Sequence, residues 1–233
     1  MARTALITGT DKGLGKYLLN TFLVHGYRVY AGRYQESTKY NDSRNIGGEA
    51  LNVIPLDVSD PESVRAAAAA VSETAEAIDL IINNAGIIHS HHDAPLEEVD
   101  IEEIPQVLNV NALGPLRIVK AFLPLLRKGS GKMIINISSE AGRIEECKYT
   151  DRVGYCMSKT AVNIQSKVLQ NALGEEGIKI IAVHPGWMQT DMGGTGADVP
   201  PIESARGVYD LSQRSWGADD PIYMDYTGKV MAW

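Results

Sequence analysis

Short apolar runs of strand length alternate with longer helical patterns along the chain, and this alternation constrains the fold more than any other feature. The runs are rich in β-branched residues and contain few polar ones, which is typical of strands covered by helices on both faces. Repeated strand–helix–strand units predict an α/β fold with a parallel, doubly wound sheet. The six clearest runs are residues 5–7, 28–31, 50–56, 80–82, 133–137 and 178–183.

The segments between these runs have helical patterns. The helix near residue 60 is predicted to begin with a capping box formed by Ser59 and Glu62, with Pro61 in the first turn. Prolines should bend or segment the long helical region, and Gly174 should cap the last of the four helices. Helices are expected over about 14–25, 60–77, 101–127 and 155–173, whereas 34–48 and 193–201 are weakly patterned.

Length and composition set broad limits. The chain has 233 residues, and α/β folds often form one unit of up to about 250 residues, so residues 1–233 are expected to form a single domain. The net charge of −7 argues against a nucleic-acid-binding face. No window approaches the ~20 apolar residues of a membrane span. Two cysteines are too few for a disulfide framework or a cysteine zinc site, and they favour a reducing, cytoplasmic setting.

A glycine-rich turn lies between the first predicted strand and the first predicted helix. It reads Thr-Gly-Thr-Asp-Lys-Gly-Leu-Gly over residues 8–15. Glycines allow the backbone to turn sharply beside a pyrophosphate, and the helix N-terminus supplies free N–H groups and a positive dipole end. A turn of this kind can also be purely structural, but its place between strand and helix favours a dinucleotide site. The candidate cofactor contacts here are Gly9, Asp11, Lys12 and Leu14.

The residue that follows the second strand selects the nucleotide. An NAD site needs a carboxylate there for the ribose 2′-hydroxyl, but the chain has Arg33 and no acid before Glu36. Together with Lys12, this arrangement favours a 2′-phosphate and therefore NADP(H), although both cations could be solvated loop charges. Asp57, followed by Val58, is placed to bind the adenine amino group after the third strand; otherwise it is a turn residue.

Six motifs follow one another along the chain. They are Thr8-Gly9-x-x-x-Gly13-x-Gly15, Asn83-Asn84-Ala85-Gly86, Asn111, Ser139, Tyr155-x-x-x-Lys159 and Pro185-Gly186. They occur at the spacings of the short-chain dehydrogenases/reductases, and the chain resembles that family over nearly its whole length. Residues 184–194 and 225–233 resemble its C-signal/sniffer-like carbonyl reductase branch. The resemblance implies a single Rossmann-type domain that binds a nicotinamide cofactor and transfers hydride.

Tyr155 and Lys159 lie four residues apart on a predicted helix and therefore share one face. A free tyrosine has a pKa near 10, and a nearby ammonium is expected to lower it. Tyr155 could then give a proton to a carbonyl oxygen or take one from an alcohol. A pair with this spacing is often only a surface pair, but this one opens the helix that follows Ser138 and Ser139.

The resemblance implies roles for further residues. Ser139 stands three residues before Gly142, as the catalytic serine of the family does, and would hold the substrate carbonyl; Ser138 is the alternative. Lys159 would also hold the nicotinamide ribose, and Asn111 would kink its helix and hold a water molecule of a proton relay. The cofactor would further contact Asn84, Ala85 and Gly86 after the fourth strand, and Pro185, Gly186, Met188 and Thr190 after the sixth.

The sequence therefore predicts an NADPH-dependent reductase of an aldehyde, ketone or diketone with Tyr155 as general acid. Two alternatives stay open: an NADP-binding regulatory or signalling protein, and an alcohol dehydrogenase that works in the oxidative direction. The expected partner is a small carbonyl compound, not a nucleic acid or a membrane. Because the family often pairs through its long helices, a homodimer or homotetramer is a further expectation.

Three features concern the rim of the substrate site. A short lid is predicted over about 188–215, and its small size predicts an open pocket that accepts many carbonyl compounds. Residues 145–149 look like a small insertion that would shape the substrate site. His89, His91 and His92 lie on a predicted loop without the carboxylate–histidine spacing of a metal site, so no metal is expected, and the rim of the substrate pocket or a solvated loop is the better interpretation.

Overall fold

Parallel pairing joins the strands into one sheet. The computed structural model describes residues 2–90, 92–194 and 196–233, and within them seven strands lie in the order β3-β2-β1-β4-β5-β6-β7, with every neighbouring pair parallel. The prediction of a doubly wound parallel sheet is confirmed, and each predicted run coincides with a strand. The strands are β1 (Thr4–Ile7), β2 (Arg28–Arg33), β3 (Leu51–Pro55), β4 (Leu80–Asn83), β5 (Met133–Ile137), β6 (Lys179–His184) and β7 (Tyr223–Asp225).

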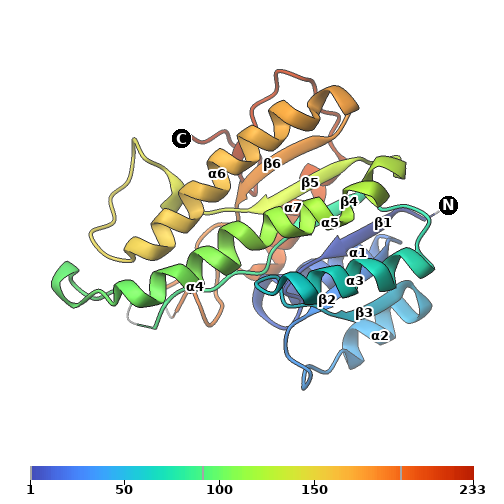
Figure 1. The fold of residues 1–233 in the computed structure, drawn as a ribbon, viewed down its shortest axis with the longest axis horizontal. Helices are drawn as coiled ribbons and strands as arrows, with labels where there is room; N and C mark the ends of the chain where they lie inside the picture. The colour runs from blue at the N-terminus through green and yellow to red at the C-terminus, as the bar shows by residue number, and fades with distance from the viewer. Residues whose placement is uncertain (1, 91, 195) are drawn as a thin grey trace.

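Helices cover both faces of this sheet (Figure 1). They are α1 (Gly13–Val24), α2 (Asn41–Gly47), α3 (Pro61–Thr74), α4 (Ile104–Leu108), α5 (Gly114–Lys128), α6 (Val153–Leu173) and α7 (Pro201–Gln213). Successive residues of a strand pack on opposite sides: Ala5 and Ile7 join the core beneath α1 and α7, whereas Leu6 joins the core beneath α3 and α5. Because each face has its own core, the strands consist almost entirely of apolar residues.

The long helical region predicted over 101–127 is segmented, as its prolines suggested. A 3₁₀ turn over Ile101–Glu103 leads into α4, and a π-helical turn over Asn109–Leu113 separates α4 from α5. Asn111 lies at the centre of the π-helical turn, so the expected interruption of the helix at this residue is present. Such turns displace the backbone by one residue and often occur at functional sites.

Two helices lie in segments for which the sequence patterns defined no helix bounds. α2 forms within the weakly patterned residues 34–48, beside a buried Tyr40. α7 forms within the predicted lid, and Ala205, Val208 and Leu211 join the core that it shares with α1. The rest of the predicted lid, apart from residue 195, which lies outside the described residues, is a series of turns before α7.

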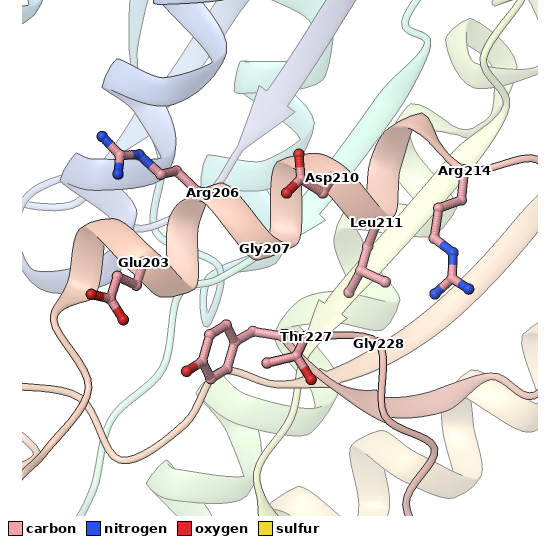
Figure 2. A pocket seen from close by; sticks show the side chains of 9 residues that line it. Glu203, Arg206, Gly207, Asp210, Leu211, Arg214, Thr227 and Gly228 are labelled. Atoms are coloured by element: carbon pink, nitrogen blue, oxygen red, sulfur yellow. The ribbon is translucent and has the colours of Figure 1, made fainter.

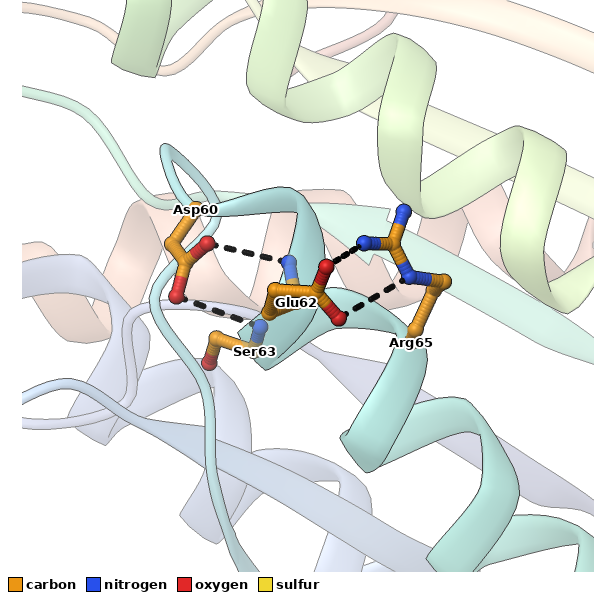
Figure 3. Close-up of polar contacts among 4 residues, drawn as sticks. All are labelled: Asp60, Glu62, Ser63 and Arg65. Carbon is orange, nitrogen blue, oxygen red and sulfur yellow. Dashed lines mark hydrogen bonds and ion pairs between the residues drawn. The ribbon is translucent and has the colours of Figure 1, made fainter.

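The capping box predicted for α3 is wrong. Asp60 is the N-cap, and its carboxylate accepts hydrogen bonds from the backbone N–H groups of Glu62 (2.9 Å) and Ser63 (3.3 Å) (Figure 3). The Ser59 hydroxyl instead donates to the carboxylate two residues earlier, and the Glu62 side chain pairs with Arg65. A carboxylate at the N-cap satisfies two free amides and complements the positive end of the helix dipole, so it is preferred to the hydroxyl beside it.

Strand order places four loops at one edge of the sheet. The carboxyl ends of β1, β4, β5 and β6 are neighbours there, and the order of the strands reverses between β1 and β4. In open α/β sheets, this reversal point is where ligands bind. The loops that meet at this edge contain residues 8–12, 84–89, 138–142 and 185–194.

Among the described residues, no helix combines the length and the apolar character needed to cross a lipid bilayer.

We predict that Asp60→Ala lowers the free energy of unfolding by about 1 kcal/mol, because it removes the side-chain cap of α3. Ser59→Ala, one residue earlier, should change it by less than about 0.5 kcal/mol. Urea denaturation of both variants measures the difference. If Ser59→Ala lowers the free energy of unfolding by as much as Asp60→Ala or more, Ser59 caps the helix, as the sequence suggested.

Candidate active site

The glycine turn is clamped to the end of β4. The Thr8 hydroxyl oxygen accepts hydrogen bonds from the N–H groups of Asn84 and Ala85, both at 3.0 Å. The Asn84 amide donates in return to the carbonyl oxygens of Thr8 (2.9 Å) and Gly9 (3.0 Å). Gly9 has a φ of +67°, and a Cβ atom there would lie 2.7 Å from the Cα of Ala85. This contact requires glycine and brings the loops after β1 and β4 together.

The N-terminus of α1 has the features of an anion site. No side chain caps its first N–H groups, and its first turn contains no acidic residue, so these donors remain open toward the glycine turn. Lys12 is the residue before the helix, and Leu14 is buried in the core below. The methyl group of Thr190 lies 3.7 Å from the position of a Cβ at Gly13. The loop after β6 therefore borders the same turn.

Asp11 joins the glycine turn to the loop after β2. Its carboxylate accepts hydrogen bonds from the N–H groups of Tyr34 and Gln35, both at 2.9 Å, and from the Thr38 hydroxyl at 3.0 Å. This contact fixes the path of the chain that follows Arg33. Asp11 therefore shapes the part of the site expected to meet the nucleotide ribose, whereas its direct contact with a cofactor stays a prediction.

A polar cavity of about 380 Å³ lies beside the end of β2. Of the two cations predicted to meet a 2′-phosphate, Arg33 lines this cavity, whereas Lys12 forms an exposed ion pair with Asp191 at 3.2 Å. Sequence reasoning missed Lys39 and Arg44, because α2, which turns Arg44 back toward β2, has no clear pattern. The cavity is lined by Arg33, Thr38, Lys39, Tyr40, Arg44 and Val53.

The turn after β3 has a structural role. Asp57 accepts hydrogen bonds from the N–H group (2.8 Å) and the hydroxyl (2.7 Å) of Ser59 through one carboxylate oxygen. Val58 is buried and packs against Gly114, where an added Cβ would lie 2.9 Å from its methyl group. The turn role considered for Asp57 is therefore present, and its contact with adenine stays a prediction.

Three candidate catalytic residues come together between β5 and α6. The Tyr155 side chain interacts with that of Ser139, and the Lys159 ammonium lies 5.6 Å from the centroid of the Tyr155 ring. Lys159 is almost fully buried and donates a hydrogen bond to the carbonyl oxygen of Ile137 at 2.8 Å. A Cβ at Gly86 would lie 3.8 Å from the same ammonium. The loops after β4 and β5 thus meet at one face of α6.

Burial controls the protonation of this group. It raises the pKa of Tyr155 to about 12, and the neighbouring Ser139 side chain offsets only part of this effect. Burial also lowers the pKa of Lys159 to about 8. The expected lowering of the tyrosine pKa is therefore wrong for this structure, because desolvation is the largest effect on Tyr155 and the Lys159 ammonium donates to the Ile137 carbonyl. At neutral pH, Tyr155 is a phenol and can donate a proton.

The two serines at the end of β5 have different surroundings. The Ser138 hydroxyl is buried and donates to the Asn163 amide oxygen at 2.6 Å. The Ser139 hydroxyl meets Tyr155 and also accepts a hydrogen bond from the N–H group of Ala141 at 3.1 Å. The structure thus brings Ser139, rather than Ser138, to the tyrosine.

Asn111 links the π-helical turn to two neighbouring segments. Its side-chain oxygen accepts from the N–H group of Ile87, and its amide donates to the Ile87 carbonyl, both at 2.8 Å. The amide also donates to the Ser158 hydroxyl at 3.0 Å. Asn111 therefore holds the chain after Gly86 against α6, and its expected role in a water-mediated relay stays a prediction.

The loop after β6 also lies at this edge of the sheet. Gly186 has a φ of +83°, and a Cβ there would lie 2.9 Å from Val199. Met188 pairs with Val199 in an isolated bridge, and the Thr190 N–H donates to the Met188 carbonyl at 2.8 Å. Pro185, Gly186, Met188 and Thr190 thus lie on one turn that reaches the glycine turn.

The histidine loop lies against the start of α6. His89 is buried beside Gly154, and its Nε2 atom has no hydrogen-bond partner. The His92 carbonyl accepts from the N–H group of Arg152 at 2.6 Å, and His91 lies outside the described residues. No group of three His, Cys, Asp or Glu side chains in the described part of the chain is arranged to hold a metal ion.

A separate cavity of about 490 Å³ lies between α7 and the turn after β7 (Figure 2). Glu203 and Arg214 stand near its two ends, and Tyr226 forms part of its lining. The ring of Tyr226 also approaches Gly186, where an added Cβ would lie 3.1 Å from it. The cavity is therefore adjacent to the loop after β6 but outside the group around Tyr155.

Comparison with known proteins gives consistent similarities. The family model for short chain dehydrogenase matches residues 3–198. The chain is 34% identical to C-signal of Myxococcus xanthus over 156 residues, which are 67% of this chain and 93% of that protein. Against several other curated relatives, which are named as steroid and retinol dehydrogenases, it spans 50 to 57% of the relative's length.

Solved structures match over the whole chain. The NADPH-bound carbonyl reductase from chicken fatty liver is 32% identical, with a TM-score of 0.89 and coverage of 100% of this chain and 99% of that one. The carbonyl reductase Sniffer of Drosophila melanogaster is 26% identical, with a TM-score of 0.91 and full coverage of both chains.

We predict that Lys159 makes stability rise with pH. Its pKa is about 8 in the folded protein, against 10.5 for an exposed lysine, so the unfolded chain binds more protons between these values. Wild-type protein should therefore gain up to ~3 kcal/mol relative to Lys159→Met as pH rises from 8 to 10.5. Urea denaturation across this range measures the gain.

The matched control is Lys167→Met, an exposed lysine on the same helix. Its difference from wild type should stay constant with pH. A constant difference for Lys159→Met as well would show that burial does not perturb Lys159.

Proposed function

The chain belongs to the short-chain dehydrogenase family, and on this basis we propose that it reduces a carbonyl compound with NADPH. One observation carries the proposal: the protonated Tyr155 lies beside the Ser139 side chain and near the buried ammonium of Lys159, where the central strands end. Reduction of a carbonyl is assisted by three groups: a proton donor, a hydroxyl that binds the carbonyl oxygen, and a cation near the developing negative charge. The similarity to carbonyl reductases over the whole chain supports the same activity.

NADP(H) is the cofactor, and the residues at the carboxyl ends of the strands suit each part of it. The open N-terminus of α1 and the glycine turn suit the pyrophosphate. Arg33, Lys39 and Arg44 around one polar cavity suit the 2′-phosphate. The nicotinamide end would meet Lys159 and Asn84, Ala85, Gly86, Pro185, Gly186, Met188 and Thr190. When bound, NADPH supplies the hydride that reaches the carbonyl carbon.

The residues of the chain control the carbonyl oxygen. Ser139 donates a hydrogen bond to this oxygen and holds it beside Tyr155. Tyr155 transfers its proton as negative charge develops on the oxygen, and the Lys159 ammonium lies 5.6 Å from the centroid of the Tyr155 ring. Tyr155 is protonated at neutral pH, which suits the donation of a proton during reduction. The turns before α7 form a short rim, which supports acceptance of a range of aldehydes, ketones and diketones.

A second candidate follows from the similarity to C-signal, a protein named for a signal. In this reading, the chain binds NADP(H) and acts without turnover. A third follows from the dehydrogenases that share half of their length with this chain, in which case it oxidises an alcohol. Measuring NADPH binding together with turnover in both directions separates the three candidates.

We also place the protein in the cytoplasm and expect it to self-associate. The thiols of Cys147 and Cys156 are free, as is usual in a reducing compartment. The long helix α6 exposes Met157, Ile164 and Val168. A second copy of the chain could cover this apolar face.

We predict that Tyr155→Phe lowers kcat for carbonyl reduction by about 10²- to 10⁴-fold, because it removes the proton donor. Oxidation of NADPH with a panel of aldehydes, ketones, diketones and quinones measures the loss. The control is Tyr149→Phe, which removes a nearby hydroxyl that bonds Glu140 and should retain most activity. Equal rates for Tyr155→Phe and wild type would contradict the mechanism.

We predict that Arg44→Gln or Arg33→Gln weakens NADPH binding by roughly tenfold, because each removes a charge-assisted contact to the 2′-phosphate. Binding of NADH, which lacks that phosphate, should change little. Fluorescence titration with both cofactors measures the ratio. Arg65→Gln, an exposed cation on α3, is the control. If the binding of NADPH and of NADH is weakened equally, these arginines maintain the structure of the site and do not contact the 2′-phosphate.

A further inference from the structure

Tyr223 contacts the turn after β5, residues 138–142, which we call the serine turn. It lies in β7, the strand at the edge of the sheet, and it is only 1% exposed. Its hydroxyl donates a hydrogen bond to the carbonyl oxygen of Ser139 at 2.8 Å, and it also hydrogen-bonds the Asn163 side chain. None of the motifs used to identify the site includes this residue.

Trp233 covers Tyr223. Their rings are stacked, with centroids 5.2 Å apart and planes inclined by 27°. The chain between them returns along β7, because the Met231 N–H donates to the Tyr223 carbonyl at 3.1 Å. The Trp233 carbonyl in turn accepts from the N–H group of Glu145 at 3.2 Å. The indole therefore packs on the Tyr223 ring, and the backbone of Trp233 contacts the predicted insertion at the rim.

Other contacts hold the rest of the serine turn. Asn163 bonds Ser138 at one end of the turn and the Gly142 carbonyl, at 3.0 Å, at the other. The N–H group of Glu140 donates to the His184 ring at 3.1 Å. α6 and β6 thus hold the residues on either side of Ser139. The Ser139 carbonyl itself accepts two hydrogen bonds, one from the Gly142 N–H group within the turn at 3.0 Å and one from the Tyr223 hydroxyl at 2.8 Å. Tyr223 is therefore the side chain that ties this carbonyl to β7.

We propose that Tyr223, supported by Trp233, is a positioning residue that aims the Ser139 hydroxyl at the substrate oxygen and at Tyr155. The inference rests on the proposed function, in which Ser139 binds the carbonyl oxygen. Catalysis depends steeply on such placement, because a displacement of about 1 Å can cost on the order of 10²-fold in rate. Tyr223 touches neither substrate nor cofactor in this role, and it acts through the backbone of Ser139.

The test is a double-mutant cycle between Tyr223→Phe and Ser139→Ala. Tyr223→Phe removes one hydrogen bond and should lower kcat roughly three- to tenfold, with the KM for NADPH unchanged. In the Ser139→Ala background, it should cause no further loss, because the group that it positions is absent. Equal effects in both backgrounds would overturn the proposal and leave Tyr223 a structural residue only.

The matched control is Tyr30→Phe. Tyr30 is also a strand tyrosine that is 1% exposed, and its hydroxyl bonds the Thr74 hydroxyl at 2.9 Å. It lies in β2, and loss of its hydroxyl should lower stability without lowering kcat.

Trp233→Ala should lower kcat, as Tyr223→Phe does. Trp233→Phe keeps a ring on Tyr223 and should retain most of the wild-type kcat. If Trp233→Phe is as slow as Trp233→Ala, stacking of a ring on Tyr223 does not contribute to the positioning of Ser139.

Hydrogen exchange separates this inference from the proposed function. The N–H groups of Ala141 and Gly142 both bond Ser139, at 3.1 Å and 3.0 Å. Tyr223→Phe should speed exchange at these two amides and leave β1 unchanged, whether or not a substrate has been found. Unchanged exchange would overturn the positioning role. If the wild-type protein reduces no carbonyl compound but Tyr223→Phe still speeds exchange, the proposed function is rejected. The conclusion that Tyr223 holds the serine turn then remains.

Discussion

The parallel pairing of β1, β4, β5 and β6 is the constraint on which the site depends. Parallel strands must be joined by crossovers through helices, so the carboxyl ends of neighbouring strands meet at one edge. The clamp between Thr8 and Asn84 then locks the two loops on either side of the point where strand order reverses. Groups separated by more than a hundred residues in sequence, such as Gly9 and Ser139, are brought to one edge by this arrangement.

Burial then sets the chemistry at that edge. It makes the ionised forms of both Tyr155 and Lys159 costly, which raises the pKa of the phenol to about 12 and lowers that of the ammonium to about 8. A phenol that stays protonated and an ammonium held beside it form a proton donor with a nearby positive charge. Lys159 is held in this position although it is only 5% exposed, and its ammonium donates a hydrogen bond to the Ile137 carbonyl.

The sequence predicted the parts of the site that depend on local spacing. The four-residue separation of Tyr155 and Lys159 determines that they share a helix face, and the glycines at 9, 13 and 15 mark a sharp turn before a helix. Lys39 and Arg44 escaped this reasoning because α2 is short and polar, with no apolar stripe to reveal it. The cap of α3 was misassigned by one residue, because spacing alone cannot rank a serine against the aspartate beside it.

The sequence by itself determined the fold class, six of the strands, the four helical segments with a clear pattern, and the family, because apolar periodicity and motif spacing are properties of the chain. Only the tertiary structure decided which serine meets Tyr155, how burial shifts the two pKa values, and that Lys12 pairs with Asp191. It also decided that Tyr223 and Trp233, more than eighty residues from Ser139, support its backbone. These contacts join distant segments, and desolvation depends on everything packed around a group, so neither can be obtained from local patterns.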